Sequence, residues 1–240
     1  MISKSKDDRI IDTVLYIILS FVLFIVLYPL YFVVIASFSD PLSVIAGNVW
    51  FWPVKFTLEP YRMVFRDPDI LTGYKNTLLY TFFGTILNVT LTVTAAYPLS
   101  KSRLKGSNFV MKMLVFTMYF GGGLIPTYLL ISKLKLLNTF WVMIISNAVS
   151  VSNIIITRTY FRTGIPVEIE ESAYVDGSSH INTLVRIVLP LSKPIIAVMI
   201  LFYGVRHWNS YFDGLIYLSD KSRFPLQLIL RGILIQNQVS

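Results

Sequence analysis

The chain has 240 residues, of which 55% are hydrophobic and only 14% are charged. Soluble domains usually contain about 25% charged residues, so this composition excludes an ordinary soluble domain and indicates an integral membrane protein. The formal net charge of +8 would suggest nucleic-acid binding in a soluble chain. The bases are not interleaved with aromatic residues as single-strand binding requires, so we expect contact with anionic membrane lipid and no nucleic-acid partner.

The sequence lacks the motifs of several kinds of active site. It contains no cysteine, which excludes disulfides, a thiol nucleophile and a cysteine metal site. His180 and His207 are far apart and belong to no H-E-x-x-H motif, so no metal site is predicted. A G-x-x-x-x-G-K-[ST] motif, which would cradle nucleotide phosphates, is missing too. We therefore predict that the chain is not an enzyme and binds no cofactor by itself.

The first third of the chain predicts one membrane span and one outer loop. Residues 1–12 are polar, and residues 13–39 are uncharged, a run longer than the roughly 7–15 apolar residues of a signal peptide and sufficient to cross a bilayer. Residues 40–75 are punctuated by proline and glycine and contain the aromatic triplet Trp50–Trp52. Because aromatic residues favour the headgroup region, we expect an extracytoplasmic loop with short helices lying on the membrane.

Basic residues after the second apolar run set the orientation. Residues 76–100 are uncharged and rich in threonine and small residues, which suits close packing of membrane helices. The next segment has bases but no acids from Lys101 to Lys112, which places it in the cytoplasm by the positive-inside rule. Because residues 113–132 must then return outward, the N-terminal segment 1–12 is predicted to be cytoplasmic.

The run 113–132 contains glycines that should break or flex its helix in the outer half. Two interpretations are equally open: the hinge of a gate, and close packing of a neighbouring helix. The candidate hinge residues are Gly121, Gly122, Gly123 and Pro126.

Two further apolar runs complete an all-α polytopic bundle with five membrane spans. Residues 136–157 bring the chain back to the cytoplasm, so residues 158–193 form a cytoplasmic loop, and residues 194–218 cross outward again. Residues 219–240 are then extracytoplasmic. Their apolar part is too short for a span and is interrupted by Arg231.

The loop 158–193 has the pattern of two short helices joined by a tight turn. Pro166 suits the start of a helix, and acidic residues follow in the early turns, where the helix dipole favours negative charge. Gly177 can adopt a left-handed cap, and Ser178 or Ser179 can cap a second helix that runs to about Val188. Small residues on the first helix would let another surface approach, so this loop is predicted to be a docking surface.

The same loop carries the residues of a known signature. Glu171-Ser172-Ala173, Gly177 and the run Ile187–Pro190 resemble the EAA motif of bacterial ABC importer permeases, E-A-A-x3-G-x9-I-x-L-P, with Ser172 in place of the first alanine. Other segments resemble the carbohydrate-importing, MalG-like branch of these binding-protein-dependent transport permeases. These segments are NTLLYT from Asn76, FGGGLIPTYLL from Phe120, LNTFW from Leu137 and HWNSYFDGLIYL from His207.

The resemblance covers most of the chain and implies a function. Residues 13–240 would be one permease domain of an ATP-driven importer in the bacterial cytoplasmic membrane, and the two short helices would be coupling helices that dock on an ATPase. The family normally has a sixth membrane helix, so we expect this chain to lack its C-terminal part. The coupling residues that the resemblance implies are Glu171, Ser172, Ala173, Asp176, Gly177, Leu189 and Pro190.

The resemblance also implies partners. A second related permease would complete the membrane domain, two ATP-binding subunits would hold ATP and Mg²⁺, and an extracellular solute-binding protein would deliver a carbohydrate, expected to be an oligosaccharide. ATP hydrolysis would belong to the partner subunits.

The last run, 194–218, is unusual because ionisable groups lie well inside it. Such groups are costly in lipid and by default face a polar cavity or a partner. Their amide, guanidinium and carboxylate groups can bind sugar hydroxyls, and neighbouring aromatic rings can stack on sugar rings. A lining of the translocation path and a structural network to a partner subunit are equally open. The candidate path residues are Tyr203, Arg206, Trp208, Asn209 and Asp213.

Three alternative functions stay open. An ABC permease for amino acids or peptides is the nearest, since only the carbohydrate-branch segments argue against it. An ion-coupled secondary carrier would need internal repeats with broken helices in corresponding positions, and one glycine cluster is not such a pair. A non-transporting scaffold or sensor subunit would tolerate changes at Glu171 or Gly177.

Overall fold

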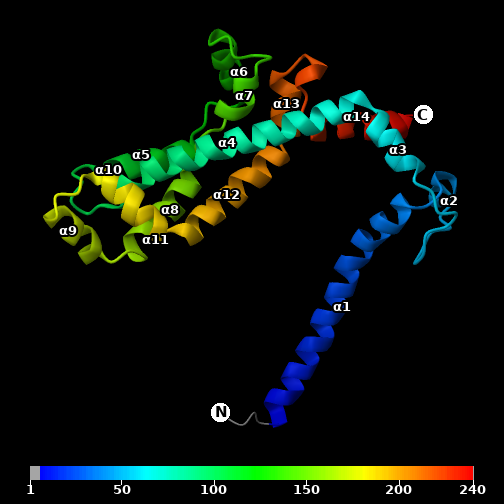
Figure 1. Ribbon diagram of the computed structural model, residues 1–240, viewed down its shortest axis with the longest axis horizontal. Helices are drawn as coiled ribbons and strands as arrows, with labels where there is room; N and C mark the ends of the chain where they lie inside the picture. Colours follow the sequence, from blue (N-terminus) through cyan, green and yellow to red (C-terminus); the bar gives the residue numbers. More distant parts are fainter. Residues whose placement is uncertain (1–5, 240) are drawn as a thin grey trace. The chain divides into compact units, whose positions relative to one another are not determined.

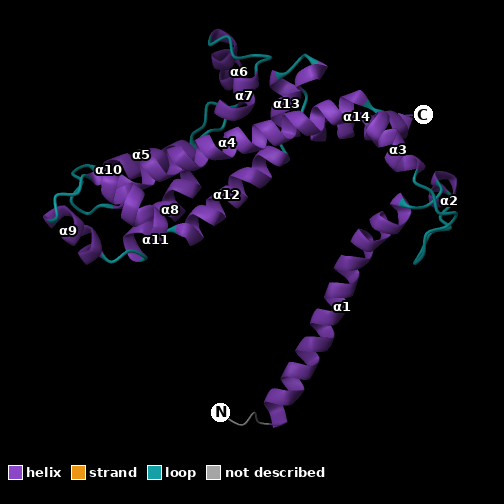
Figure 2. Cartoon of the chain, viewed as in Figure 1, coloured by secondary structure: helices purple, strands orange, loops and turns teal. Residues whose placement is uncertain are grey.

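The computed structural model describes residues 6–239 (Figure 1), and the chain divides into two compact units, Met1–Pro68 and Asp69–Ser240. Within the described residues, every regular element is a helix (Figure 2). The all-α prediction is therefore confirmed.

The first unit consists of one long helix and a loop with two short ones. The long helix α1 (Lys6–Ser37) is apolar over Arg9–Ser37, and most of its side chains are exposed within the first unit. The loop carries α2 (Pro41–Ile45), which Asp40 caps, and α3 (Glu59–Arg66), which contains no buried residue. The short helices predicted within residues 40–75 are present, and their position on a membrane stays a prediction.

The aromatic segment of that loop is held against α1 by hydrogen bonds. The hydroxyl of Tyr28 donates to the carbonyl of Trp50 at 3.3 Å, and the hydroxyl of Tyr31 donates to the carbonyl of Phe51. Trp50, Phe51 and Trp52 themselves are exposed. The backbone of the segment is thus anchored while its rings are free to meet lipid or another protein.

The second unit is built on two helices that lie side by side, α4 (Pro68–Ser100) and α12 (Lys193–Trp208) (Figure 1). Polar pairs join them: the Asn88 amide lies 3.0 Å from Nε2 of His207, and the hydroxyls of Thr92 and Tyr203 are 2.6 Å apart. Gly84 allows this approach, because a Cβ there would lie 2.4 Å from Nε2 of His207. Thr92 and Gly84 of α4 therefore take part in packing against α12, which is the role predicted for residues of this kind.

A third helix, α8 (Val151–Thr163), completes the main core of this unit. The core residues are the large apolar and aromatic side chains that α4, α8 and α12 bury, together with side chains of the loop before α12. They include Val93, Tyr97, Ile154, Phe161, Ile165, Val188, Met199 and Tyr203. A smaller cluster contains Tyr80, Ile131, Val142, Met143, Tyr217 and Leu218.

Three of the predicted spans are broken in the structure. Residues 113–132 fall on α5 (Ser107–Tyr119) and α6 (Leu124–Lys133), which meet at 109°. Residues 136–157 are divided between α7 (Phe140–Ile145) and α8. Residues 194–218 are divided between α12 and α13 (Tyr211–Tyr217).

These breaks affect the count of spans. By length and composition, α1 and α4 are each long and apolar enough to span a membrane. The number of candidate spans rises to at most four if each bent pair of helices is counted as one span. The predicted total of five is therefore not reached by these measures. The reason is that the breaks leave segments shorter than the roughly 20 residues that cross a bilayer.

The last helix, α14 (Leu226–Val239), packs against the start of α4. The amide of Asn76 donates to the carbonyl of Ser222 at 2.8 Å, and the backbone N–H of Leu226 donates to the Thr77 hydroxyl at 2.9 Å. The turn before it, η2 (Lys221–Arg223), is capped by Asp220, and the hydrogen bonds from Ser222 hold the pKa of the Asp220 carboxyl below its usual value. With 14 residues, α14 is shorter than a simple span.

Candidate functional site

The loop that joins α8 to α12 folds as the predicted pair of short helices. Because α8 runs on to Thr163, the loop comprises residues 164–192, and we call it the EAA loop. It contains α9 (Val167–Val175), α10 (His180–Thr183), the π-helical turn η1 (Leu184–Val188) and α11 (Leu189–Leu191). The structure differs from the prediction in detail, since Pro166 is the N-cap of α9 rather than its first helical residue.

The turn between α9 and α10 needs a glycine. Gly177 has φ +80°, and its N–H donates to the carbonyl of Tyr174 while the N–H of Ser178 donates to that of Ala173. These two bonds form a Schellman motif, which closes a helix with a left-handed residue. Ser179 then caps α10 by accepting from the N–H of Asn182 at 3.3 Å. Both the left-handed cap and the serine cap are confirmed.

The second half of the loop is less regular. A π-helical turn separates α10 from α11, and the chain then bends by 85° at Ser192 into α12. Leu189 is half-buried, whereas Pro190 is exposed. The helix predicted to end near Val188 is present. Its last turn, Leu184–Val188, is π-helical and therefore wider than an α-helical turn.

The predicted coupling residues differ in their exposure to solvent. Glu171, Ser172, Asp176 and Gly177 are exposed, whereas Ala173 is buried within this chain. A contact from this part of α9 to another protein would therefore come from the exposed neighbours of Ala173. Glu171 is bound to Arg103 at 2.7 Å, and both side chains are largely in solvent.

Two apolar side chains beside the turn were not predicted. Val175 is 87% exposed and Ile181 is 76% exposed, one on each side of Gly177. Leaving two such side chains in water is unfavourable unless a partner covers them. The signal was present in the sequence, because both are isolated aliphatic residues in an otherwise polar segment.

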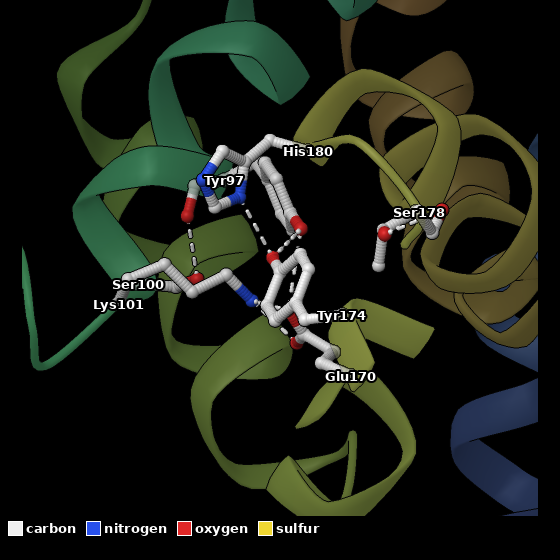
Figure 3. Close-up of polar contacts among 8 residues, drawn as sticks. Tyr97, Ser100, Lys101, Glu170, Tyr174, Ser178 and His180 are labelled. Carbon is white, nitrogen blue, oxygen red and sulfur yellow. Dashed lines mark hydrogen bonds and ion pairs between the residues drawn. The ribbon is translucent and has the colours of Figure 1, made fainter. Parts of the chain in front are cut away.

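A buried polar cluster beneath α9 was missed as well (Figure 3). Glu170 is 5% exposed and binds Lys101, which follows α4, while the Tyr97 hydroxyl donates to Oε2 of Glu170 at 3.2 Å. Tyr174 bridges the hydroxyl of Tyr97, at 3.1 Å, and Nδ1 of His180, at 2.9 Å. Sequence reasoning treated Glu170 only as an acid in an early helical turn, because its partners are distant in the chain.

A pocket of about 620 Å³ opens beside this cluster. Its lining combines basic, acidic and aromatic side chains from the end of α4, the end of α8 and the EAA loop. They include Lys101, Arg103, Phe161, Arg162, Val167, Glu171, Tyr174 and His180. Charges of both signs line it.

Two of the candidate path residues, Arg206 and Asp213, belong to a second polar site, at the breaks of two helices. Asn147, in the break before α8, links Arg206 and Asp213: its carbonyl accepts from the Arg206 guanidinium at 3.3 Å, and its amide donates to the Asp213 carboxylate at 3.4 Å. Arg206 is exposed, and the Asn209 amide donates to the carbonyl of Val205 at 2.8 Å. The sequence did not assign Asn147 to this site, since it lies in another predicted span.

The two aromatic path candidates are placed differently. Tyr203 is 1% exposed and bonds to Thr92 and to the N–H of Ser150, so it belongs to the core between α4, α8 and α12. Trp208 is half-buried and packs edge-on against Tyr74. Neither ring is free to stack on a ligand along its whole face in this conformation.

The hinge candidates lie at the break between α5 and α6. Gly123 has φ +85° and ψ −179°, a conformation open almost only to glycine. No atom lies within 4 Å of a Cβ added at Gly121 or Gly123, and the nearest atom at Gly122 is Cβ of Pro126. All three glycines lie in the break between α5 and α6, and among the described residues no helix approaches Gly121 or Gly123 closely.

Among the described residues, no group of three histidine, aspartate or glutamate side chains is placed to hold a metal ion. The two polar sites contain paired charges and hydrogen bonds instead.

Long apolar helices, broken helices and a connecting loop with a glycine turn point to a polytopic membrane protein. Comparison with known proteins gives the family. The chain is 37% identical over 237 residues to Protein LplC of Bacillus subtilis, covering 99% of this chain and 80% of that protein. No family model matches the sequence.

Two further relatives carry descriptive names. The polygalacturonan/rhamnogalacturonan transport system permease protein YtcP of Bacillus subtilis is 36% identical over 228 residues, covering 95% of this chain and 79% of that one. A solved bacterial ABC transporter involved in the import of the acidic polysaccharide alginate contains a chain that matches with a TM-score of 0.92 and 32% identity, over 98% of this chain and 84% of that one. The protein belongs to the family of sugar ABC transporter permeases.

Proposed function

We propose that this protein is a transmembrane permease subunit of a bacterial ATP-driven importer for a carbohydrate, specifically an oligosaccharide. The proposal rests on the named relatives and on one structural observation. That observation is the glycine turn of the EAA loop, which presents Val175 and Ile181 as exposed apolar side chains on either side of Gly177.

The turn supplies the docking surface for a partner ATPase in this proposal. Gly177 has no atom within 4 Å of an added Cβ, so its outer side is open to a second protein. Val175 and Ile181 would provide the apolar contacts, while Asp176 and the partly paired Glu171 would provide polar ones. Exposed apolar anchors rimmed by polar groups are typical of protein interfaces.

The remaining subunits follow from this role. A second related permease completes the membrane domain, two ATP-binding subunits hydrolyse ATP with Mg²⁺, and an extracellular binding protein delivers the sugar. The N-terminus and the EAA loop lie in the cytoplasm, and five segments of the chain cross the cell membrane, three of them as broken helices. The bend at Gly121–Gly123 and Pro126 serves as a gate hinge.

The polar site at Asn147, Arg206 and Asp213 is our candidate for the translocation path. Arg206 is exposed and uses only one of its five N–H donors on Asn147 in the contacts described above. A guanidinium fork of this kind binds carboxylates. We therefore propose an acidic oligosaccharide as the cargo, in keeping with the acidic polysaccharide named for the alginate importer.

The test uses the complex of this chain with its partner permease, ATPase subunits and binding protein in proteoliposomes. We expect ATP-dependent uptake of a labelled uronate oligosaccharide, and we expect Gly177→Trp to abolish it because the indole blocks the docking surface. Gly177→Ala is a control, because it introduces the same backbone strain as Gly177→Trp at φ +80° but not the bulk of the indole. Gly106→Trp places the same indole at another exposed left-handed glycine, with φ +86°.

Normal uptake by Gly177→Trp would refute the docking assignment. Uptake that proceeds without ATP would refute the importer and favour an ion-coupled carrier. Loss of uptake in Gly177→Ala and Gly106→Trp as well would mean that strain or bulk, rather than docking, explains the effect.

A further inference from the structure

Two adjacent glutamates of the EAA loop have opposite environments. Glu170 is 5% exposed, whereas the side chain of Glu171 is 47% exposed. Each is paired with a base from the segment directly after α4, Glu170 with Lys101 and Glu171 with Arg103. Water and salt screen the exposed pair, which makes it a weak attachment. The buried pair is the one that can hold two parts of the chain together.

The buried carboxylate is satisfied from the end of α4. Lys101 contacts both of its oxygens, and the Tyr97 hydroxyl donates to one of them at 3.2 Å. The Lys101 ammonium also lies 4.2 Å from the centroid of the Tyr97 ring, where a cation–π attraction adds to the pair. A buried ion pair with this many partners is costly to break, because either partner alone would be left as an uncompensated charge.

The same cluster reaches both short helices of the loop. Tyr174, on α9, bonds to Tyr97, on α4, and to His180, the first residue of α10 (Figure 3). The two helices on either side of Gly177 are therefore attached to one point on α4. Their relative position does not depend on the glycine turn alone.

The Glu170–Lys101 pair connects the EAA loop to α4, a helix that does not adjoin the loop in the sequence. The EAA loop continues directly into α8 and α12, whereas α4 is separated from it in sequence by α5 to α8. Farther along, α4 pairs with α12 through Asn88–His207 and Thr92–Tyr203. If a displacement of the EAA loop moves both α4 and α12, these contacts keep the two helices together as one unit.

We infer that Glu170 and Lys101 form a clamp that makes α4 follow the EAA loop, so that they act as positioning residues for coupling rather than as docking residues. The inference rests on the proposed function, since it assumes that the loop receives the movement of an ATPase. Without the clamp, the loop can shift on its connections at residues 164–166 and at Ser192 while α4 stays behind. ATP is then hydrolysed without transport.

The test measures sugar uptake and ATP hydrolysis in the same reconstituted complexes. We expect Glu170→Lys and Lys101→Glu each to lower the sugar transported per ATP by about tenfold or more, while the ATPase subunits still co-purify. The double exchange Glu170→Lys/Lys101→Glu should recover much of the ratio, because it restores opposite charges at the same place. Glu170→Gln, which keeps the shape and one acceptor, provides a milder break if a reversed charge prevents assembly.

Lys105→Glu is the matched control, since it makes the same charge change at an exposed position of the same segment. Its transport per ATP should equal that of the wild type. The clamp would be overturned if Glu170→Gln, Glu170→Lys and Lys101→Glu all transported as much sugar per ATP as the wild type. It would also be overturned if the double exchange transported no more sugar per ATP than the single variants. A proportional loss of uptake and hydrolysis would show a merely structural role. Failure of the wild type to import with ATP would instead refute the proposed function.

Discussion

At the scale of single residues, the position of a side chain around a short helix decides its role. Glu170 and Glu171 are chemically identical neighbours on α9, yet one is buried against Tyr97 and Lys101 and the other faces solvent. Successive residues of a helix point about 100° apart, so adjacent side chains meet different surroundings. Motif spacing identified Glu171, and packing singled out Glu170.

Arg206 supplies a prediction at the same scale. If its guanidinium binds a substrate carboxylate, Arg206→Gln removes a charge-assisted hydrogen bond worth about 1.5–3 kcal/mol, which corresponds to a loss of roughly ten- to hundredfold in apparent affinity. The loss should be confined to acidic oligosaccharides, because neutral ones lack the carboxylate. Uptake of a uronate oligosaccharide and of its reduced, neutral counterpart measures this difference.

Arg206→Lys is the control for charge, since it keeps the cation but not the planar fork. It should retain part of the preference for the acidic sugar. An equal loss for acidic and neutral sugars in Arg206→Gln would assign Arg206 to the structural network with Asn147 instead.

At the scale of elements, the sequence predicts some helix breaks and not others. The break between α5 and α6 was predicted, because three glycines and a proline act locally on the backbone. The breaks before α8 and after α12 were not predicted. Ser150 caps α8 while its N–H donates to Tyr203, and this contact depends on a helix far away in the sequence.

The α5–α6 bend gives a prediction about Gly123. Its backbone conformation strains any side-chain-bearing residue by about 1–3 kcal/mol, so Gly123→Ala should lower the melting temperature of the purified complex and slow uptake. Gly121→Ala is the matched control, because Gly121 has a negative φ and open space around it. Equal behaviour of the two variants would contradict the role of Gly123 in the bend.

The contact of α4 with α12 gives another prediction. A methyl group at Gly84 would lie 2.4 Å from Nε2 of His207, whereas one at Gly204 would lie 3.9 Å from its nearest neighbour, Oγ1 of Thr85. Overpacking of this kind costs about 1–3 kcal/mol. Gly84→Ala should therefore lower the thermal stability, and Gly204→Ala should leave it unchanged, in melting curves of the detergent-solubilised complex. A tolerated Gly84→Ala would mean that the helices can separate without cost.

At the scale of the whole molecule, much apolar surface is uncovered in each unit. Most apolar side chains of α1 are exposed within the first unit, and Phe82, Phe83 and Ile86 of α4 are exposed within the second. In water such surface would be strongly unfavourable. Lipid tails would cover such surface in a membrane, which agrees with the membrane protein that the composition indicates.

The orientation of the chain can be tested with single cysteines, since the natural sequence contains none. Asn48→Cys and Ser219→Cys should react with a membrane-impermeant maleimide in intact cells. Ser102→Cys should react only after the membrane is permeabilised, because the bases around it predict a cytoplasmic loop. Labelling of all three from outside, or the reverse pattern, would contradict the proposed topology.

Features that depend on composition or on neighbours in the chain could be predicted from the sequence. Apolar runs predicted a helical membrane protein, Gly177 predicted a left-handed turn, and motif spacing predicted the family. The pairing of the polar groups, in contrast, became visible only in the folded chain. The Glu170–Lys101 pair, the bridge of Asn147 between Arg206 and Asp213 and the burial of Tyr203 all join residues far apart in the chain. Such pairs depend on how helices pack, and a single sequence carries no local signal for them.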